Sequence, residues 1–139
     1  MSNGYLLDTH ILIWLLDDDD RLYKDIREDI DYFQYSYHVS VETLREVVIL
    51  QSLKKISFML TMDNIINDLQ KRQIDILPVE AIHIKALEKL PVLTINGKKH
   101  EDPFDRLLIS QSVAEKYTII SSDFKFPFYK KHGLKLLVN

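Results

Sequence analysis

Hydrophobic residues follow two different patterns along this chain. Short runs rich in Leu, Ile, Val and Tyr predict strands, and longer segments with an apolar residue at every third or fourth position predict amphipathic helices. The strand-like runs are Tyr5–Leu7, Tyr35–Val39, Ile74–Val79, Thr118–Ser121 and Leu134–Val138. Because these runs alternate with helical segments, the sequence predicts an α/β fold built on a largely parallel sheet.

The helical segments differ in how much of their surface is apolar. Thr9–Leu16 is apolar nearly all round, which predicts a buried helix. The run Asp17–Asp20 ends it, and we expect the same run to form the acidic start of the next helix. Amphipathic stripes predict four more helices: Leu22, Ile26, Ile30 and Phe33; Val41, Leu44 and Val48; Met62, Ile65, Ile66 and Leu69; and Ile84, Leu87 and Leu90.

The C-terminal half begins with a predicted loop and continues with a strong helix. Residues 91–103 contain two prolines and the Asn96-Gly97 pair, which predicts a surface loop. Phe104–Tyr117 has a helical pattern, and Asp102 and Pro103 stand at its start. We therefore expect the last two strands to flank only a short aromatic segment after this helix.

Length and composition fit one globular domain over residues 1–139. The chain is 46% hydrophobic and 28% charged, and it shows no internal repeat or low-complexity linker. It has no cysteine, which excludes disulfides, zinc–thiolate centres and thiol catalysis. Its longest apolar run, Ile11–Leu16, is too short to cross a bilayer. We therefore expect a soluble, cytoplasmic protein.

The net charge of −3 conceals an uneven distribution. Residues 1–31 hold nine acids and three bases, whereas the rest of the chain has a small excess of bases. This overall balance alone does not indicate nucleic-acid binding. Five C-terminal lysines either follow a nucleic-acid backbone or only keep the protein soluble: Lys98, Lys99, Lys125, Lys130 and Lys131. For the aromatic segment Phe124–Tyr129 we favour core or dimer contacts over base stacking.

Several acids follow predicted strands or lie in the helices after them. They are Asp8, Glu42, Glu46, Asp102, Asp105 and Asp123. In an open parallel sheet the carboxyl ends of the strands meet at one edge, so we expect most of these acids to lie close together. Converging carboxylates repel one another unless a cation is present. Because neither Cys nor His accompanies them as a ligand, the pattern favours Mg²⁺ or Mn²⁺ over Zn²⁺.

Each acid on its own also has an ordinary structural explanation. A lone Asp8 is more often a turn or helix cap than a ligand. Glu42 and Glu46 fit a solvated helix face on which Arg45 offsets their repulsion. Asp102, just before a proline, predicts a helix N-cap. Only the joint arrangement of the acids therefore points to a metal site.

Four sequence blocks, in this order, resemble a known family. They are YLLDTHILIW (residues 5–14), VSVETLRE (39–46), HEDPFDRLLI (100–109) and SSD (121–123). The blocks resemble PIN-domain proteins, in particular toxins of the VapC type. The resemblance implies a three-layer α/β/α fold with a mostly parallel central sheet of about five strands.

The resemblance also implies roles for particular residues. It assigns catalysis and the binding of Mg²⁺ or Mn²⁺ to four acids: Asp8, Glu46, Asp105 and Asp123. The residues expected to orient ligands or to contact the substrate are Thr9, Ser121, Arg106 and Asp102. Among these, Asp102 is expected mainly to cap a helix, and Arg106 shares with His100 the role of contacting RNA phosphate or supporting the site.

This chain departs from the family pattern at three places. Arg45 stands where the family usually has Trp, so we expect altered packing near Glu46 or a tether to Glu42. Ser121 replaces the commoner Thr and keeps the hydroxyl. The loop at 93–99 is longer than usual and places Lys98-Lys99 near its tip. None of the three changes removes an expected ligand.

The resemblance implies a metal-dependent endoribonuclease that acts as the toxin of a toxin–antitoxin pair. Its expected partners are an RNA substrate, a small VapB-like antitoxin and a second copy of the chain in a homodimer. A PIN-fold module that binds RNA or a protein without catalysis is the alternative. A receiver-type phospho-acceptor fits less well, because Thr9 and not a second acid follows Asp8.

Overall fold

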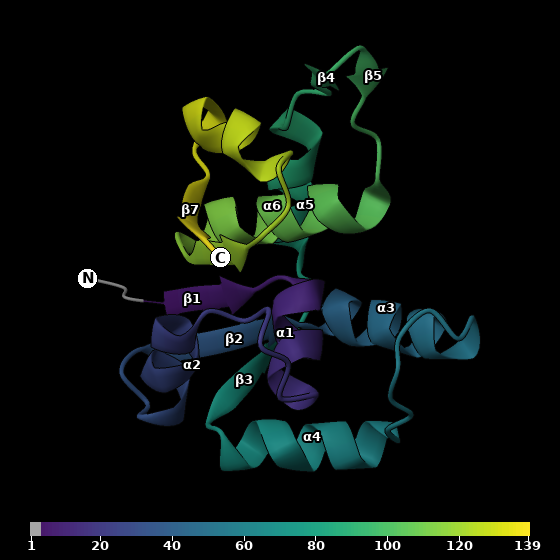
Figure 1. Cartoon of the computed structure of the whole chain (residues 1–139). Coiled ribbons are helices and arrows are strands. Elements are labelled where there is room, and N and C mark those ends of the chain that lie inside the picture. The colour runs from purple at the N-terminus through teal and green to yellow at the C-terminus, as the bar shows by residue number, and fades with distance from the viewer. Residues whose placement is uncertain (1–3) are drawn as a thin grey trace.

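The centre of the molecule is a five-stranded sheet in which every strand pairing is parallel. The computed structural model describes residues 4–139 (Figure 1), so residues 1–3 of the predicted domain lie outside the described part. The strands are β1 (Gly4–Leu7), β2 (Ser36–Ser40), β3 (Ile74–Leu77), β6 (Thr118–Ser121) and β7 (Lys135–Val138). Their order is β3-β2-β1-β6-β7. The α/β fold with a parallel sheet is therefore confirmed.

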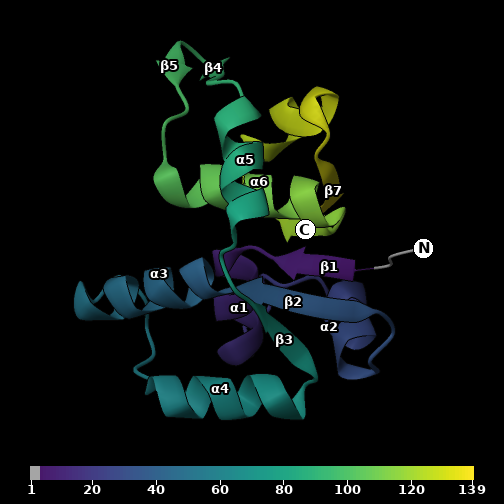
Figure 2. The same ribbon diagram turned by 180° about the vertical axis from the view of Figure 1, so that it is seen from behind.

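Helices cover both faces of this sheet. They are α1 (Thr9–Leu16), α2 (Lys24–Asp31), α3 (Val41–Ser52), α4 (Met62–Lys71), α5 (Ala81–Lys89), α6 (Pro103–Glu115) and the 3₁₀ helix η1 (Phe126–His132). Two views from opposite sides place α5, α6 and η1 on one side and α1, α2 and α4 on the other (Figures 1 and 2). The molecule thus has three layers, and α3 extends beyond the carboxyl ends of β1 and β2.

Two hydrophobic cores follow from the alternation of side chains along the central strand. Leu6 and Leu7 are adjacent in β1 and both fully buried, and they point to opposite faces of the sheet. Leu7 belongs to the core formed with α1–α4, and Leu6 to the core formed with α6 and η1. Burial on both faces explains why the central strand β1 carries no polar side chain.

The buried faces of two helices differ from the predicted stripes. In α3 the prediction was wrong for Val41 and Val48, which are exposed, whereas Thr43 and Val47 are buried. In α5 the predicted Ile84 is exposed and its neighbour His83 is fully buried. The cause lies in the tertiary packing. Helix α3 packs against α1 and α6, and α5 packs against α6. The residues buried at these contacts include polar ones, which a hydrophobic stripe does not reveal.

The start of α2 also differs from the prediction. Asp17 ends α1, as expected, but α2 begins only at Lys24, so the acidic run does not form its first turn. Asp19 instead binds Arg21 with an N–O distance of 2.7 Å. Phe33, the last residue of the predicted stripe, follows the helix with φ +52° and is exposed.

Part of the predicted loop 91–103 forms a small antiparallel hairpin. Its strands are β4 (Thr94–Ile95) and β5 (Lys98–Lys99), and they project above α6 in Figure 1. Asn96 and Gly97 join them with φ values of +51° and +80°. Two consecutive positive φ angles are the geometry of the tight hairpin turn that Asn-Gly favours. The turn residues were thus identified from sequence, and the pairing of their flanks was not.

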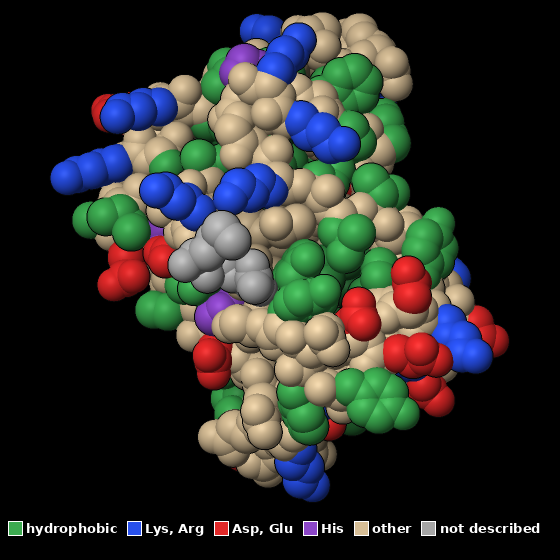
Figure 3. All heavy atoms as spheres, turned by 90° about the vertical axis from the view of Figure 1, so that its left-hand side faces the viewer, with side chains coloured by type: hydrophobic (Ala, Val, Ile, Leu, Met, Phe, Trp, Pro, Cys, Tyr) green, Lys and Arg blue, Asp and Glu red, His purple; other side chains and the backbone are tan. Residues whose placement is uncertain are grey.

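The surface divides by charge. Seen from the side on which the chain begins, most Lys and Arg side chains in view lie on the upper half, and most Asp and Glu side chains lie lower (Figure 3). This division matches the uneven distribution of charge along the sequence. Within the described residues, no helix is long and apolar enough to span a membrane.

Candidate metal centre

The strand order of the sheet reverses between β1 and β6. From β1 the chain adds β2 and then β3 on one side, and β6 and then β7 on the other. At such a reversal the loops after the two central strands diverge and leave a crevice at the carboxyl edge. Asp8 follows β1 at this edge, and Asp123 follows β6.

Asp8 is buried and held by neutral hydrogen-bond donors. Its carboxylate accepts a bond from the Thr9 backbone N–H at 2.7 Å, which makes it the N-cap of α1. The Ser121 hydroxyl donates to its other oxygen at 2.6 Å. Ser121 Oγ in turn accepts from the Asp123 backbone N–H at 3.0 Å. These contacts fix Asp8 across the β1–β6 pair without giving it a cationic partner.

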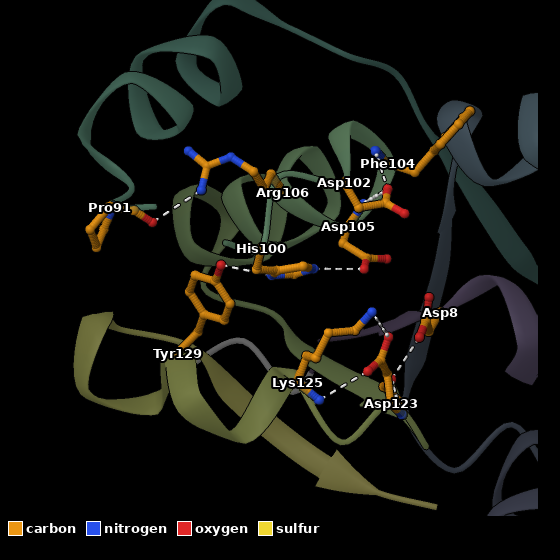
Figure 4. Close-up of polar contacts among 11 residues, drawn as sticks. Asp8, Pro91, His100, Asp102, Phe104, Asp105, Arg106, Asp123, Lys125 and Tyr129 are labelled. Atoms are coloured by element: carbon orange, nitrogen blue, oxygen red, sulfur yellow. Dashed lines mark hydrogen bonds and ion pairs between the residues drawn. The ribbon is translucent and has the colours of Figure 1, made fainter. Parts of the chain in front are cut away.

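Asp123 is half-buried and turned toward the same edge (Figure 4). One carboxylate oxygen accepts from the Lys125 backbone N–H at 2.9 Å, and the other lies 3.9 Å from Lys125 Nζ. The turn after β6 thus holds this acid through its own backbone. Among the described residues, Lys125 is the only lysine or arginine that forms an ion pair with Asp8, Glu46, Asp105 or Asp123.

Glu46 approaches from α3. The Thr9 hydroxyl donates to its carboxylate at 2.5 Å, so Thr9 contacts Asp8 through its backbone and Glu46 through its side chain. Asp8, Glu46 and Asp105 line one small cleft. Arg45 turns away from Glu46: its guanidinium lies 3.3 Å from a Glu42 oxygen and stacks over the Phe104 ring at 5.0 Å. The expected tether to Glu42 is therefore present.

Asp105 lies in the first turn of α6 and is held by a histidine. Its carboxylate is 2.9 Å from His100 Nε2, and His100 Nδ1 is 2.7 Å from the Tyr129 hydroxyl (Figure 4). When Asp105 is ionised, as it must be to bind a metal ion, it can only accept a hydrogen bond. In that state His100 donates from Nε2 and accepts the Tyr129 hydroxyl proton at Nδ1. His100 and Tyr129 are both buried, so together they orient the Asp105 carboxylate.

Asp102 and Arg106 have structural contacts in the same region. Asp102 is the N-cap of α6, and its carboxylate accepts from the N–H groups of Phe104 and Asp105 at 2.9 and 3.2 Å. Arg106 donates to the carbonyls of Pro91 and Leu90 at 3.0 and 3.1 Å. In Figure 4 its guanidinium lies on the side away from Asp8 and Asp123. Arg106 therefore ties α6 to the end of α5 instead of contacting the acids.

Burial and mutual repulsion perturb two of the acids strongly. Burial raises the pKa of Asp8 from 3.8 to about 6, and the hydrogen bonds from Ser121 and Thr9 counteract part of that rise. Burial, together with the charges of Asp102, Asp8 and Asp123, raises the pKa of Asp105 from 3.8 to about 8. Burial and the nearby Lys125 charge lower the pKa of His100, so its ring is neutral at pH 7. The carboxyl edge of the sheet therefore holds several carboxylates and too few cationic side chains to balance them.

These residues fit a hard divalent cation. The available ligand atoms are carboxylate oxygens. A bound cation would offset the repulsion between the carboxylates and lower the raised pKa values of Asp8 and Asp105. Among the described residues, no three of these acids place ligand atoms within 4.8 Å of one another. Mg²⁺ commonly takes only one or two carboxylates directly and keeps several waters. The spacing thus suits a hard divalent cation that keeps water in part of its coordination shell.

A tighter group of candidate ligands lies elsewhere, between α5 and α6. Glu80, His83 and Glu115 bring three ligand atoms within 4.8 Å of one another. However, His83 Nδ1 accepts from the Glu80 backbone N–H at 2.9 Å, so Nε2 carries the ring proton and donates to Glu115 at 2.7 Å. A metal at Nε2 would have to displace that proton from a neutral ring. The group is accordingly a buried hydrogen-bonded link between the two helices.

Sequence reasoning missed Tyr129 as part of the site. Tyr129 was assigned to a core or dimer contact, and its ring is indeed fully buried in the core. Its hydroxyl is hydrogen-bonded to His100, and the two rings lie 5.5 Å apart between centroids. The available signal was chemical: a buried tyrosine needs a hydrogen-bond partner for its hydroxyl, and His100 is a polar residue that precedes a predicted helix.

Comparisons with known proteins agree with this architecture. The model of the PIN domain family matches residues 5–131, so the chain belongs to the PIN domain family. A search of curated protein sequences finds no match.

Solved structures share the fold over nearly the whole chain. One is from VapBC2 of Rickettsia felis bound to a DNA fragment from their promoter: 18% identity, TM-score 0.66, covering 97% of this chain and 98% of that one. Another is from DNA-bound VapBC of Salmonella typhimurium: 11% identity, TM-score 0.65, covering 99% and 98%. At these identities the likeness concerns the fold.

Proposed function

We propose that this chain is a Mg²⁺- or Mn²⁺-dependent endoribonuclease and the toxin of a toxin–antitoxin pair. One observation carries the proposal. Asp8, Glu46 and Asp105, from three distant parts of the chain, line one cleft, and Asp123 lies close enough to raise the pKa of Asp105. This cleft lies at the reversal point of a PIN-domain sheet.

Each residue of the proposed site has a separate role in the reaction. A bound Mg²⁺ or Mn²⁺ supplies Lewis acidity, which lowers the pKa of water and neutralises charge on a phosphodiester. The direct ligands we propose are Asp8, Glu46 and Asp105, with Asp123 holding a water at the periphery. Thr9 and Ser121 keep the carboxylates of Glu46 and Asp8 in place by donating to them. His100 donates to Asp105 and leaves the other oxygen of that carboxylate free to bind.

Mutation of the two acids with raised pKa values tests this proposal. We expect Asp8→Asn and Asp105→Asn each to reduce Mn²⁺-dependent cleavage of single-stranded RNA by more than about 100-fold, beyond the usual effect of losing a residue that only orients a ligand. Asp63→Asn, an exposed acid in α4, is the matched control and should cleave normally. Equal cleavage by all four proteins would contradict the proposal. RNA binding without cleavage would favour the non-catalytic module.

The proposed partners are a small VapB-like antitoxin and a second copy of the chain. The two solved structures described above come from VapBC complexes. This chain also leaves apolar side chains exposed on and after α3: Val48, Ile49, Leu53 and Met59. Exposed apolar side chains grouped on one helix and the loop after it are suited to a protein partner. Co-expression with any small open reading frame found next to its gene, followed by co-purification, tests the antitoxin, and light scattering of the purified chain alone tests the homodimer.

A further inference from the structure

A second concave surface lies next to the proposed metal centre, between the β4–β5 hairpin and the turn after β6. This hairpin groove has a volume of about 470 Å³, within the range of sites that hold a small ligand. Lys98 and Lys99 line it from the hairpin, and Phe124 and Lys125 line it from the turn. His100 lines it too, and because His100 is hydrogen-bonded to Asp105, the groove lies next to the proposed metal centre.

The hairpin holds its two lysines in a defined place. Thr94 pairs with Lys99, Ile95 pairs with Lys98, and Ile95 is anchored in the core beneath α6 and η1. The His100 backbone N–H extends the ladder by donating to the Leu93 carbonyl at 2.8 Å. The lysines are thus presented by a paired and anchored element and not by a free loop.

The groove differs from the metal centre in charge and in chemistry. It carries three lysines against two acids, Glu101 and Asp102, and the Asp102 carboxylate is occupied as the N-cap of α6. At the other wall Phe124 is 63% exposed, and Lys125 Nζ lies 5.8 Å from its ring centroid. Lysines along one wall and an exposed aromatic ring on the other are a combination that binds single-stranded nucleic acid.

We propose that the hairpin groove binds a single-stranded RNA segment next to the bond that is cut. Phe124 stacks on a base, and Lys98 and Lys99 neutralise the adjacent phosphates. The inference deepens the proposed function and rests on it, because the proposed metal centre determines where the RNA is cut. The groove adjoins that centre at His100. It also gives the long 93–99 loop a role in choosing the substrate.

Binding measured without catalysis tests this inference. The full-length chain is titrated in EDTA into a short fluorescein-labelled single-stranded RNA of mixed sequence, and a gel confirms that the RNA stays intact. We expect Phe124→Ala to weaken binding by roughly 5- to 150-fold, as for loss of one stacked base. Lys98→Ala/Lys99→Ala should weaken binding and also lower the salt dependence, by about 0.7 in log–log slope per lost phosphate contact.

The chain offers matched controls on η1, away from the groove. Phe128→Ala removes another exposed aromatic ring, and Lys130→Ala/Lys131→Ala removes two exposed lysines. Weaker binding by the groove variants alone, with unchanged melting temperatures, supports the inference. Equal losses in groove and control variants, or no RNA binding by the wild type, would overturn it. Groove-dependent binding by a wild type that cleaves nothing in Mn²⁺ would instead overturn the proposed ribonuclease and leave the groove standing.

Discussion

At the scale of single residues, the site is a set of carboxylates kept in an unfavourable state. Asp8 is only 8% exposed, and its partners are a hydroxyl and a backbone N–H. Asp105 has a neutral histidine as its partner, and the negative charges of three other acids raise its pKa. A fold that evolved only for stability would pair or expose such groups. Buried carboxylates with perturbed pKa values and no lysine or arginine partner are characteristic of functional sites.

The raised pKa values predict how the stability of the metal-free protein depends on pH. Between about pH 4 and 8 the folded state holds protons on Asp105 that the unfolded state has released, and Asp8 does the same up to about pH 6. The free energy of unfolding must therefore fall as the pH rises, by at most about 1.4 kcal/mol per pH unit for each carboxyl, and level off above about pH 8.

Urea denaturation in EDTA at a series of pH values checks this. The Asp105→Asn variant should lose its share of the slope, so it should be more stable than the wild type near pH 8 and differ less near pH 5. Asp20→Asn, at an exposed position in the acidic run, controls for the loss of one formal charge. A wild-type curve that rises from pH 5 to 8, with Asp105→Asn running parallel to it, would show that the carboxyl is not perturbed in this way.

At the scale of elements, three short segments cooperate to place one carboxylate. η1 buries the ring of Tyr129, the residue after β5 supplies His100, and the first turn of α6 supplies Asp105. Asp102 starts α6 at this point by capping two N–H groups, and so fixes where Asp105 stands. The position of the acid thus depends on contacts that span about 30 residues of chain.

These contacts predict the effect of removing one hydroxyl. Tyr129→Phe keeps the buried ring but leaves His100 Nδ1 without its donor, so the imidazole is free to change tautomer and release Asp105. We expect the rate of Mn²⁺-dependent RNA cleavage to fall about 10- to 100-fold. RNA binding in EDTA should stay unchanged. Tyr117→Phe, which removes a hydroxyl at a half-buried tyrosine stacked on His38, is the control. Full activity in Tyr129→Phe would show that His100 orients Asp105 without help.

The elements also show what sequence can and cannot predict here. Strand β6 and helix α1 were predicted to the residue, because a β-branched run and an apolar octet bounded by Asp are strong local signals. The buried face of α3 was predicted correctly only at Leu44, since the helix packs against α1 and α6 and its buried residues include Thr43 and Gln51. The Asp17–Asp20 run shows the same limit. A group of acids between two predicted helices does not indicate whether it ends the first helix or begins the second.

At the scale of the whole molecule, the sheet order brings the candidate site together. Alternating strands and helices predict a parallel sheet, and a general rule then places polar groups at its carboxyl edge. Nothing in the local pattern specifies that β1 lies between β2 and β6, yet that order puts Asp8 beside Ser121 and Asp123. The set of acids came from family resemblance, whereas their environment could come only from the structure. Contacts such as Tyr129 to His100 join residues 29 positions apart, and no spacing rule predicts them.

This arrangement predicts a global effect of the metal. The proposed ligands come from the ends of β1 and β6 and from α3 and α6, so a bound ion ties both helical layers to the sheet. An ion that binds only the folded state stabilises it by RT ln(1 + [L]/Kd), which is about 2.7 kcal/mol at a concentration 100 times the dissociation constant. We expect Mn²⁺ to raise the melting temperature by several degrees in the wild type.

Two variants decide which part of the molecule is responsible. Asp105→Asn should abolish the Mn²⁺-dependent rise in melting temperature, whereas Glu115→Gln should keep it, because His83 Nε2 donates its proton to Glu115 and is closed to metal. Glu115→Gln itself should lower the melting temperature with and without Mn²⁺ alike, since it weakens the buried link between α5 and α6. The reverse result, a rise lost in Glu115→Gln and kept in Asp105→Asn, would place the ion between α5 and α6 and remove the acids at the sheet edge from the mechanism.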